Sequence, residues 1–327
     1  MNERQMIIMV PNGTSSRTYR DDEPLLVRRA KAVLKSGIRA VAPVPPGRRH
    51  VLLVFGCQRS GTTMLQQSLL DHSWRTILLE EHDRRLTAND PERLRWDDLD
   101  LISKRILRLP FELVVAKPLA ESHRSVELLD SLGEAKGIWM LRHFLSVANS
   151  NLTRFGKDNG YRDLQILVEK WASDWRGTGS EQVRRQVADL LPTGLSPLDA
   201  AAVFWWARNK LYVDQALWHE ERIKVLRYES LLANPNECLR ALSKFIGIEF
   251  PVRTMARSVR SATAVKGELR PDVGRLCSEL FAEFEGAPSI SVLFGCGNFC
   301  GRSQRIQPGR TVLCPACSDR QLRLLLL

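Results

Sequence analysis

Residues 51–63 read VLLVFGCQRSGTT, an apolar run followed by a glycine-bounded turn and the start of a helical pattern. The run 51–55 predicts a buried strand, and Gly56 and Gly61 bound the turn. A strand, a glycine turn and a helix in this order form the setting of a phosphate-binding loop, because backbone N–H groups and a helix N-terminus then face an anion. The segment therefore predicts an α/β fold with an anion site at the end of one core strand.

The loop carries an arginine but no lysine. In loops that bind nucleoside triphosphates, a lysine and a Mg²⁺ ion held by a Ser or Thr hydroxyl neutralise the β- and γ-phosphates. Here Thr62 and Thr63 directly follow Gly61, and Arg59 is the fixed cation of the loop. We therefore expect a donor group that is less highly charged than a triphosphate and that binds without Mg²⁺.

Short apolar runs alternate with helical patterns along the rest of the chain. After 51–55 the runs cover residues 76–79, 113–116, 138–141 and 223–226. This alternation predicts a three-layer α/β fold of the P-loop type, with a central parallel sheet flanked by helices. The segment 157–222 is expected to be helical, and we interpret its aromatic stripe as core: Phe204, Trp205, Tyr212 and Trp218.

Polar and charged residues directly follow each apolar run. In an open parallel sheet the ligand crevice lies outside the carboxyl ends of the strands, so these groups should meet at one edge. They are the glycine loop, Glu80-Glu81-His82, Lys117, Arg142 and Arg227-Tyr228-Glu229. Unrelated solvated charges would show no such preference for the ends of strands.

Three segments in order resemble the sulfotransferase family, whose donor is 3′-phosphoadenosine 5′-phosphosulfate (PAPS). CQRSGTTML resembles the 5′-phosphosulfate loop, and residues 138–155 resemble the 3′-phosphate stretch, in which an Arg ends a strand and a Ser follows eight residues later. Residues 227–248 resemble the Tyr-Glu-Asp-Leu segment and its following helix, with Ser230 in place of the usual Asp. The likeness is to bacterial members and, around the acidic pair, to tyrosylprotein sulfotransferases.

The resemblance implies a donor site. The loop of the family holds the 5′-phosphosulfate, Arg142 and Ser150 would hold the 3′-phosphate through paired Arg–phosphate hydrogen bonds, and Tyr228 would contact the adenosine. A buried Tyr with a structural role fits the last position as well. Arg59 is also a candidate catalytic residue. The loop residues concerned are Arg59, Ser60, Gly61, Thr62 and Thr63.

The resemblance also implies catalytic residues. Lys117 matches a lysine that stabilises charge on the bridging oxygen of the leaving group. The acceptor must lose a proton as it attacks, and Glu80, Glu81 and His82 are candidates to take it. In the acidic pair of the tyrosylprotein enzymes the second Glu is the base, so we expect that role for Glu81, with Glu80 packing or pairing with a basic neighbour. His123 lies too far beyond Lys117 to match the histidine base of many cytosolic members.

Two other classes of function stay open at this point. A P-loop kinase or other nucleotide-dependent phosphotransferase would need the absent loop lysine and an acidic residue that binds Mg²⁺. A non-catalytic binding protein with a zinc tail would not need a complete donor site. The net charge of +11 fits an anionic donor or acceptor, or simply an Arg-rich surface, and we find no nucleic-acid-binding module.

The chain divides into three predicted regions: an extension at 1–46 with one helix, a sulfotransferase domain at 47–288, and a cysteine-rich tail at 289–327. The tail contains two close pairs that could close a tetrahedral structural zinc site, although the spacing of the first pair only approximates a knuckle. A chance cluster is the alternative. The four cysteines are Cys296, Cys300, Cys314 and Cys317.

Partners and location follow from what the chain lacks. No apolar stretch approaches the length of a membrane span, and the N-terminus shows no signal-peptide pattern, so we expect a cytoplasmic protein. The helical segment 157–222 is expected to form the acceptor side of the cleft. The acceptor itself stays open among a small phenol, a carbohydrate, a lipid and a peptide, and the sequence leaves the oligomeric state open, because a fold does not fix a substrate.

Overall fold

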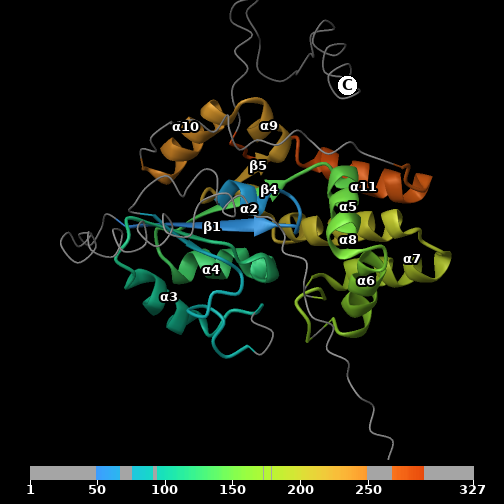
Figure 1. Cartoon of the computed structure of the whole chain (residues 1–327), viewed down its shortest axis with the longest axis horizontal. Coiled ribbons are helices and arrows are strands. Elements are labelled where there is room, and N and C mark those ends of the chain that lie inside the picture. Colours follow the sequence, from blue (N-terminus) through green and yellow to red (C-terminus); the bar gives the residue numbers. More distant parts are fainter. Residues whose placement is uncertain are drawn as a thin grey trace, which may run out of the picture. The chain divides into compact units, whose positions relative to one another are not determined.

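The structure is a computed structural model, and it describes residues 49–66, 76–90, 94–171, 173–177, 179–248 and 267–290 (Figure 1). The chain divides into two units, Met1–Val292 and Leu293–Leu327, and every described residue belongs to the first. The predicted helix of the N-terminal extension lies outside the described residues, as do the tail cysteines. The three regional boundaries stay predictions.

A five-stranded parallel sheet with the order β2-β3-β1-β4-β5 forms the centre of the molecule. All five predicted runs are strands in this sheet, and β2 and β3 have the predicted bounds. The strands are β1 (His50–Gly56), β2 (Thr76–Leu79), β3 (Leu113–Ala116), β4 (Lys136–Leu141) and β5 (Ile223–Arg227). The sheet continues briefly beyond β5, because Val225 N donates to Pro288 O at 2.9 Å and Ile290 N donates to Val225 O at 2.8 Å.

Helices cover both faces of the sheet, so the predicted three-layer α/β fold is confirmed. In Figure 1, α9 and α10 lie on one side of β1 and α3 and α4 on the other. The helices are α2 (Thr62–Met64), α3 (Leu99–Leu107), α4 (Ser125–Ser131), α5 (Phe144–Phe155), α6 (Asn159–Glu169), α7 (Glu181–Leu190), α8 (Pro197–Asp214), α9 (Tyr228–Ala233), α10 (Pro235–Ile246) and α11 (Pro271–Glu283). Short 3₁₀ helices are η3 (Leu119–Arg124), η4 (Leu191–Thr193) and η5 (Leu217–His219).

Strand β1 is apolar at successive positions because both of its faces are buried, as is typical of a parallel sheet. Leu52 and Val54 belong to a core cluster that includes residues of α9 and α10. Leu53 and Phe55 belong to a larger cluster with α3, α4 and α8 on the opposite face. Burial on both faces fixes β1 at the centre of the sheet, and its carboxyl end leads into the glycine loop.

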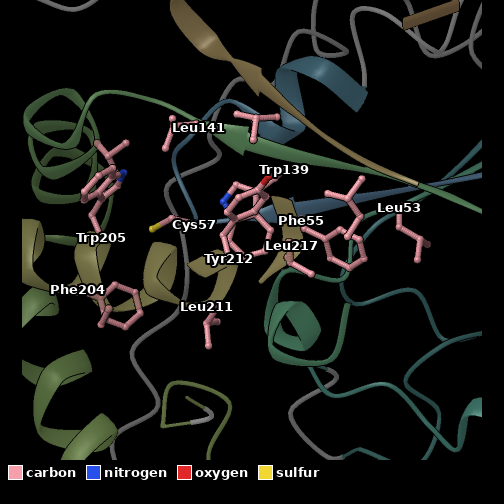
Figure 2. Packing of buried hydrophobic residues seen from close by; sticks show 14 of the residues in the cluster. Leu53, Phe55, Cys57, Trp139, Leu141, Phe204, Trp205, Leu211, Tyr212 and Leu217 are labelled. Atoms are coloured by element: carbon pink, nitrogen blue, oxygen red, sulfur yellow. The ribbon is translucent and has the colours of Figure 1, made fainter. Parts of the chain in front are cut away.

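Helix α8 is the scaffold of the larger cluster. Its start is a capping box, in which Ser196 Oγ accepts from Asp199 N at 3.1 Å and Ser196 N donates to Asp199 Oδ2 at 3.1 Å. Trp205 and Tyr212 are buried, and the Tyr212 ring meets that of Trp139 in β4 edge-on (Figure 2). The prediction of a core stripe is confirmed for Phe204, Trp205 and Tyr212, whereas Trp218 on η5 is 39% exposed.

No helix in the described ranges combines the length and apolar character needed to cross a membrane. The predicted helical character of residues 157–222 is confirmed by α6, α7 and α8.

Candidate functional site

Two glycines shape the loop after β1, and neither position accepts a side chain. Gly56 has φ +121°, and a Cβ there would lie 2.6 Å from Met140 O in the neighbouring strand. Gly61 has φ +92°, and a Cβ there would lie 2.4 Å from Cδ2 of Tyr228. Arg59 also adopts a positive φ of 69°, which costs a residue with a side chain conformational energy. Such a backbone is typical of a loop formed around a ligand.

The predicted donor-binding residues from three segments lie together. Arg59 Nε donates to Ser150 Oγ on α5 at 3.0 Å, and the Arg59 carbonyl accepts from Arg142 Nη1 at 3.3 Å. Arg142 follows β4 directly and is 7% exposed. The Arg59 guanidinium also lies 6.0 Å from the centre of the Phe155 ring. The end of β1, the end of β4 and helix α5 therefore contribute to one cationic site.

A third arginine, Arg154, belongs to this cationic site and was missed in the sequence. Burial lowers the pKa of Arg59, and the nearby charges of Arg154 and Arg142 lower it further. In the part of the chain that the structure describes, none of the three forms an ion pair with a carboxylate. A group of arginines that repel one another and have no carboxylate partner favours the binding of an anion. The overlooked signal was spacing, because Arg154 stands four residues after Ser150 on one helix.

Two buried polar atoms of the site have no hydrogen-bond partner among the described residues. They are Oγ of Ser60, which is completely buried, and Nε of Arg142. Buried polar atoms are nearly always paired in folded proteins, so each such exception needs an explanation. Both atoms can donate to the oxygens of a phosphate or sulfate group. The donor atoms present therefore fit an anionic ligand.

Tyr228 packs between the loop and Arg142, which follows β4. Its ring packs against Gly61, and the Arg142 guanidinium lies over it at 4.3 Å from the ring centre. Both contacts are structural, and the guanidinium gains a cation–π interaction from the second. The expected contact with adenosine stays a prediction.

Lys117 places an ammonium group beside the loop, which itself contains no lysine. It follows β3 directly and is 6% exposed, and its Nζ donates to Thr63 Oγ1 at 3.0 Å. The same Nζ forms an ion pair with Glu80 Oε2 at 2.7 Å. One ammonium group thus joins the segments that follow β1, β2 and β3, as expected for strands whose carboxyl ends meet at one edge.

The two glutamates that follow β2 differ in their surroundings. Glu80 is paired with Lys117, which is the kind of basic neighbour expected from the sequence. Burial raises the pKa of Glu81, the charges of Lys117 and His82 oppose this shift, and that of Glu80 adds to it. Within the described ranges the Glu81 carboxylate has no hydrogen-bond or ion-pair partner. A carboxylate that is desolvated and unpaired is well suited to accept a proton.

The two histidines near these glutamates lie in different environments. His82 is exposed in the turn after β2. His123 lies on η3, where burial lowers its pKa to about 4 against the opposing charge of Glu121, and its Nδ1 is buried without a partner among the described residues. The His123 imidazole is therefore neutral at physiological pH.

Buried ionic contacts behind the site were not visible in the sequence. Glu121 on η3 is fully buried and accepts from Arg95 at 2.8 Å and Arg124 at 2.7 Å. Asp163 on α6 pairs with Arg176 at 2.7 Å and also accepts from Gln58 in the loop at 3.5 Å. Apart from the pair of Glu121 and Arg124, which are three residues apart, these contacts join residues that are distant in the chain, so no local pattern marks them.

The four tail cysteines lie outside the described residues, and the zinc site stays a prediction. Among the described residues, no group of three or more His, Cys, Asp or Glu side chains could hold a metal ion. We expect metal analysis of the full chain to find about one equivalent of zinc, lost in the double variant Cys314→Ser, Cys317→Ser. Less than about a tenth of an equivalent in the unsubstituted chain would identify the cysteines as a chance cluster.

Comparison with known protein families assigns the chain to one family. A profile of the sulfotransferase domain matches residues 49–266, more than half of the chain. Curated proteins gave no significant match. Similar solved structures include a sulfotransferase from Alicyclobacillus acidocaldarius (18% identity, 71% of this chain and 91% of that chain covered, TM-score 0.39). A second is the sulfotransferase domain of the Synechococcus PCC 7002 olefin synthase (16% identity, 73% of this chain and 97% of that chain covered, TM-score 0.43). A third is a sulfotransferase from Mycobacterium avium (13% identity, 78% of this chain and 80% of that chain covered, TM-score 0.42). The chain belongs to the sulfotransferase family and is an enzyme of sulfuryl transfer.

Proposed function

We propose that the enzyme transfers the sulfuryl group of PAPS to an acceptor hydroxyl or amine. The observation that carries this proposal is the pair of buried, unpartnered donors, Ser60 Oγ and Arg142 Nε, beside the cluster of Arg59, Arg142 and Arg154. PAPS has anionic groups at two separated positions, the 5′-phosphosulfate and the 3′-phosphate. The loop, together with Arg142 after β4 and with Ser150 and Arg154 on α5, matches such a ligand better than it matches a linear triphosphate.

The donor is held in two places in this proposal. The loop from Arg59 to Thr63 binds the 5′-phosphosulfate, with Ser60 Oγ donating to one of its oxygens. Arg142 and Ser150 bind the 3′-phosphate, where the planar guanidinium can donate two parallel hydrogen bonds. The present bond between Arg59 and Ser150 would then be replaced by bonds from each residue to the ligand.

The transfer is an in-line displacement at sulfur. The acceptor oxygen or nitrogen forms a bond to sulfur while the bond from sulfur to the bridging oxygen of the donor breaks, and the acceptor proton passes to Glu81. The products are the sulfated acceptor and 3′-phosphoadenosine 5′-phosphate (PAP). Negative charge develops on the bridging oxygen as PAP departs. Lys117, whose ammonium group contacts Thr63 at the end of the loop, stabilises this charge. Glu80 holds the Lys117 ammonium in place.

We expect PAP to stabilise the protein strongly in EDTA, and Mg-ATP to do so weakly. A ligand that binds the native state alone raises the free energy of unfolding by about 2.7 kcal/mol at a hundred times its Kd. Adenosine 5′-monophosphate, which lacks the 3′-phosphate, should bind much less tightly than PAP. Thermal shift measured with each nucleotide over a concentration series gives the three affinities.

Matched variants test the proposed binding of the 3′-phosphate. Arg142→Gln and Ser150→Ala should lower PAP affinity toward that of the monophosphate, whereas Arg162→Gln, at an exposed arginine of α6, should leave it unchanged. Stabilisation by Mg-ATP and not by PAP would overturn the proposed donor and favour the alternative function of a nucleotide-dependent phosphotransferase. The acceptor is then sought by incubating labelled PAPS with fractionated cell extract and detecting a mass gain of about 80 Da, that of SO₃.

A further inference from the structure

The guanidinium of Arg208 on α8 is buried in the core behind the site. The residue is 2% exposed, and in the described part of the chain its hydrogen bonds go to two main-chain carbonyls and no ion pair compensates its charge. Its Cζ lies 5.0 Å from the centre of the Trp175 ring. An unpaired buried charge is costly, and an apolar side chain of similar volume would serve stability at least as well. The charge therefore needs an explanation other than stability.

One of the two carbonyls belongs to the segment that carries Lys117. Arg208 Nη2 donates to Leu119 O at 2.8 Å, and Leu119 N donates to Lys117 O at 3.1 Å. Ser122 Oγ also donates to Leu119 O, at 2.9 Å, and accepts from Gly56 N of the loop at 3.3 Å. Arg208 therefore holds η3, Lys117 and the first glycine of the loop in one hydrogen-bonded group.

The other carbonyl belongs to the segment 173–177. Arg208 Nη1 donates to Trp175 O at 3.0 Å. The adjacent Arg176 is fixed to α6 by its ion pair with Asp163, which also accepts from Gln58 of the loop. Arg208 thus joins two segments, 117–122 and 173–177. The first contacts the loop directly at Gly56, and the second is linked to the loop through Asp163.

We propose that Arg208 is a positioning residue for sulfuryl transfer, which joins the Lys117 segment to the segment 173–177 and supplies positive charge to Glu81. This inference rests on the role of Glu81 as base in the proposed function. Two main-chain carbonyls hold the Arg208 guanidinium in place, so it cannot turn toward a carboxylate that would neutralise its charge. Its field therefore stays available to the site, where fixed charges are worth most.

The charges around both groups agree with this role. Burial raises the pKa of Glu81. The charges of Lys117 and His82 oppose this shift most, that of Glu80 adds to it, and that of Arg208 opposes it to a smaller extent. Lys117 is itself paired with Glu80. Burial lowers the pKa of Arg208 to about 10, so it keeps its charge at neutral pH; the groups that act on it are Cys57, Glu121, Glu81 and Arg176.

Two variants separate the charge of Arg208 from its hydrogen bonds. In Arg208→Met, which has neither, the Glu81 titration midpoint should move upward, and the amides of 119–124 and 173–177 should exchange with solvent about tenfold faster or more. Arg208→Lys keeps a charge without the planar fork, so the midpoint should stay near that of the unsubstituted enzyme while exchange still accelerates. The midpoint is measured by ¹³C NMR of glutamate-labelled protein, with the signal assigned from Glu81→Gln, and exchange by mass spectrometry.

Asn209→Ala is the control, because this buried neighbour on α8 bonds to Trp139 Nε1 at 3.0 Å and carries no charge. It should loosen the helix without moving the Glu81 midpoint. An unchanged midpoint in Arg208→Met, or an equal shift in Asn209→Ala, would overturn the inference. So would loss of PAP binding in both Arg208 variants, because Arg208 would then serve the fold alone. Absence of PAP binding and of transfer in the unsubstituted enzyme would instead refute the proposed function.

Discussion

Lys117→Met is expected to lower kcat for sulfuryl transfer about 10²–10³-fold, the effect of removing one preorganised donor to developing negative charge. The Lys117 ammonium reaches the loop at Thr63 from a nearly buried side chain, and a charge acts more strongly there than in water. Met keeps the apolar bulk of the side chain and removes the ammonium. Turnover of PAPS, followed as PAP formation, should therefore fall far more than PAP affinity measured by thermal shift.

Lys136→Met is the matched control for this variant. Lys136 begins β4, at the opposite end of the strands from the site, and its Nζ donates to Phe245 O at 2.6 Å. Its loss should leave kcat unchanged. If Lys117→Met raised the KM for PAPS and left kcat intact, the lysine would bind the donor equally in the ground and transition states, and its proposed role at the leaving group would be wrong.

The sheet could be predicted from the sequence because each strand contains a short apolar run. Burial of these runs is most complete in β1, β3 and β4. The pattern did not mark the start of β4, since Lys136 and Gly137 are not apolar yet pair with Leu52 and Leu53 of β1. Neighbouring strands, rather than local hydrophobicity, decide where such a strand begins. For helix α8, by contrast, the local sequence was enough to predict a place in the core. The helix is apolar nearly all round, so it must be enclosed by other elements.

The loop, the ends of the strands and Lys117 were predictable because parallel strands place their carboxyl ends at one edge. The buried ionic contacts were not. Arg208 stands among alanines and tryptophans with nothing in its neighbourhood to indicate that it bonds to Leu119 and Trp175. Glu121 likewise reads as an ordinary polar residue of a short helix, although it is fully buried between two arginines. Contacts of this kind depend on how distant segments pack.

Glu81→Gln is expected to slow transfer by about 10²–10⁴-fold, the usual effect of removing a general base, while PAP affinity stays unchanged. Glu80→Gln should slow transfer much less, because Lys117 keeps its bond to Thr63 when its partner carboxylate is removed. The two variants differ by one position and by no charge, so each controls for the other. Both are measured as kcat with saturating PAPS and as PAP affinity by thermal shift.

The pH dependence of kcat provides a second test of Glu81. The base must be ionised to take the acceptor proton, and burial raises its pKa above that of an ordinary glutamate. Activity should therefore fall as the pH is lowered through that raised pKa, at a higher pH than for an exposed carboxylate, and the residual activity of Glu81→Gln should lack this step. If Glu80→Gln were the inactive variant, the base would be the first glutamate. If both stayed active while His82→Ala or His123→Ala lost activity, the base would be an imidazole, which for His123 would fit its neutral state.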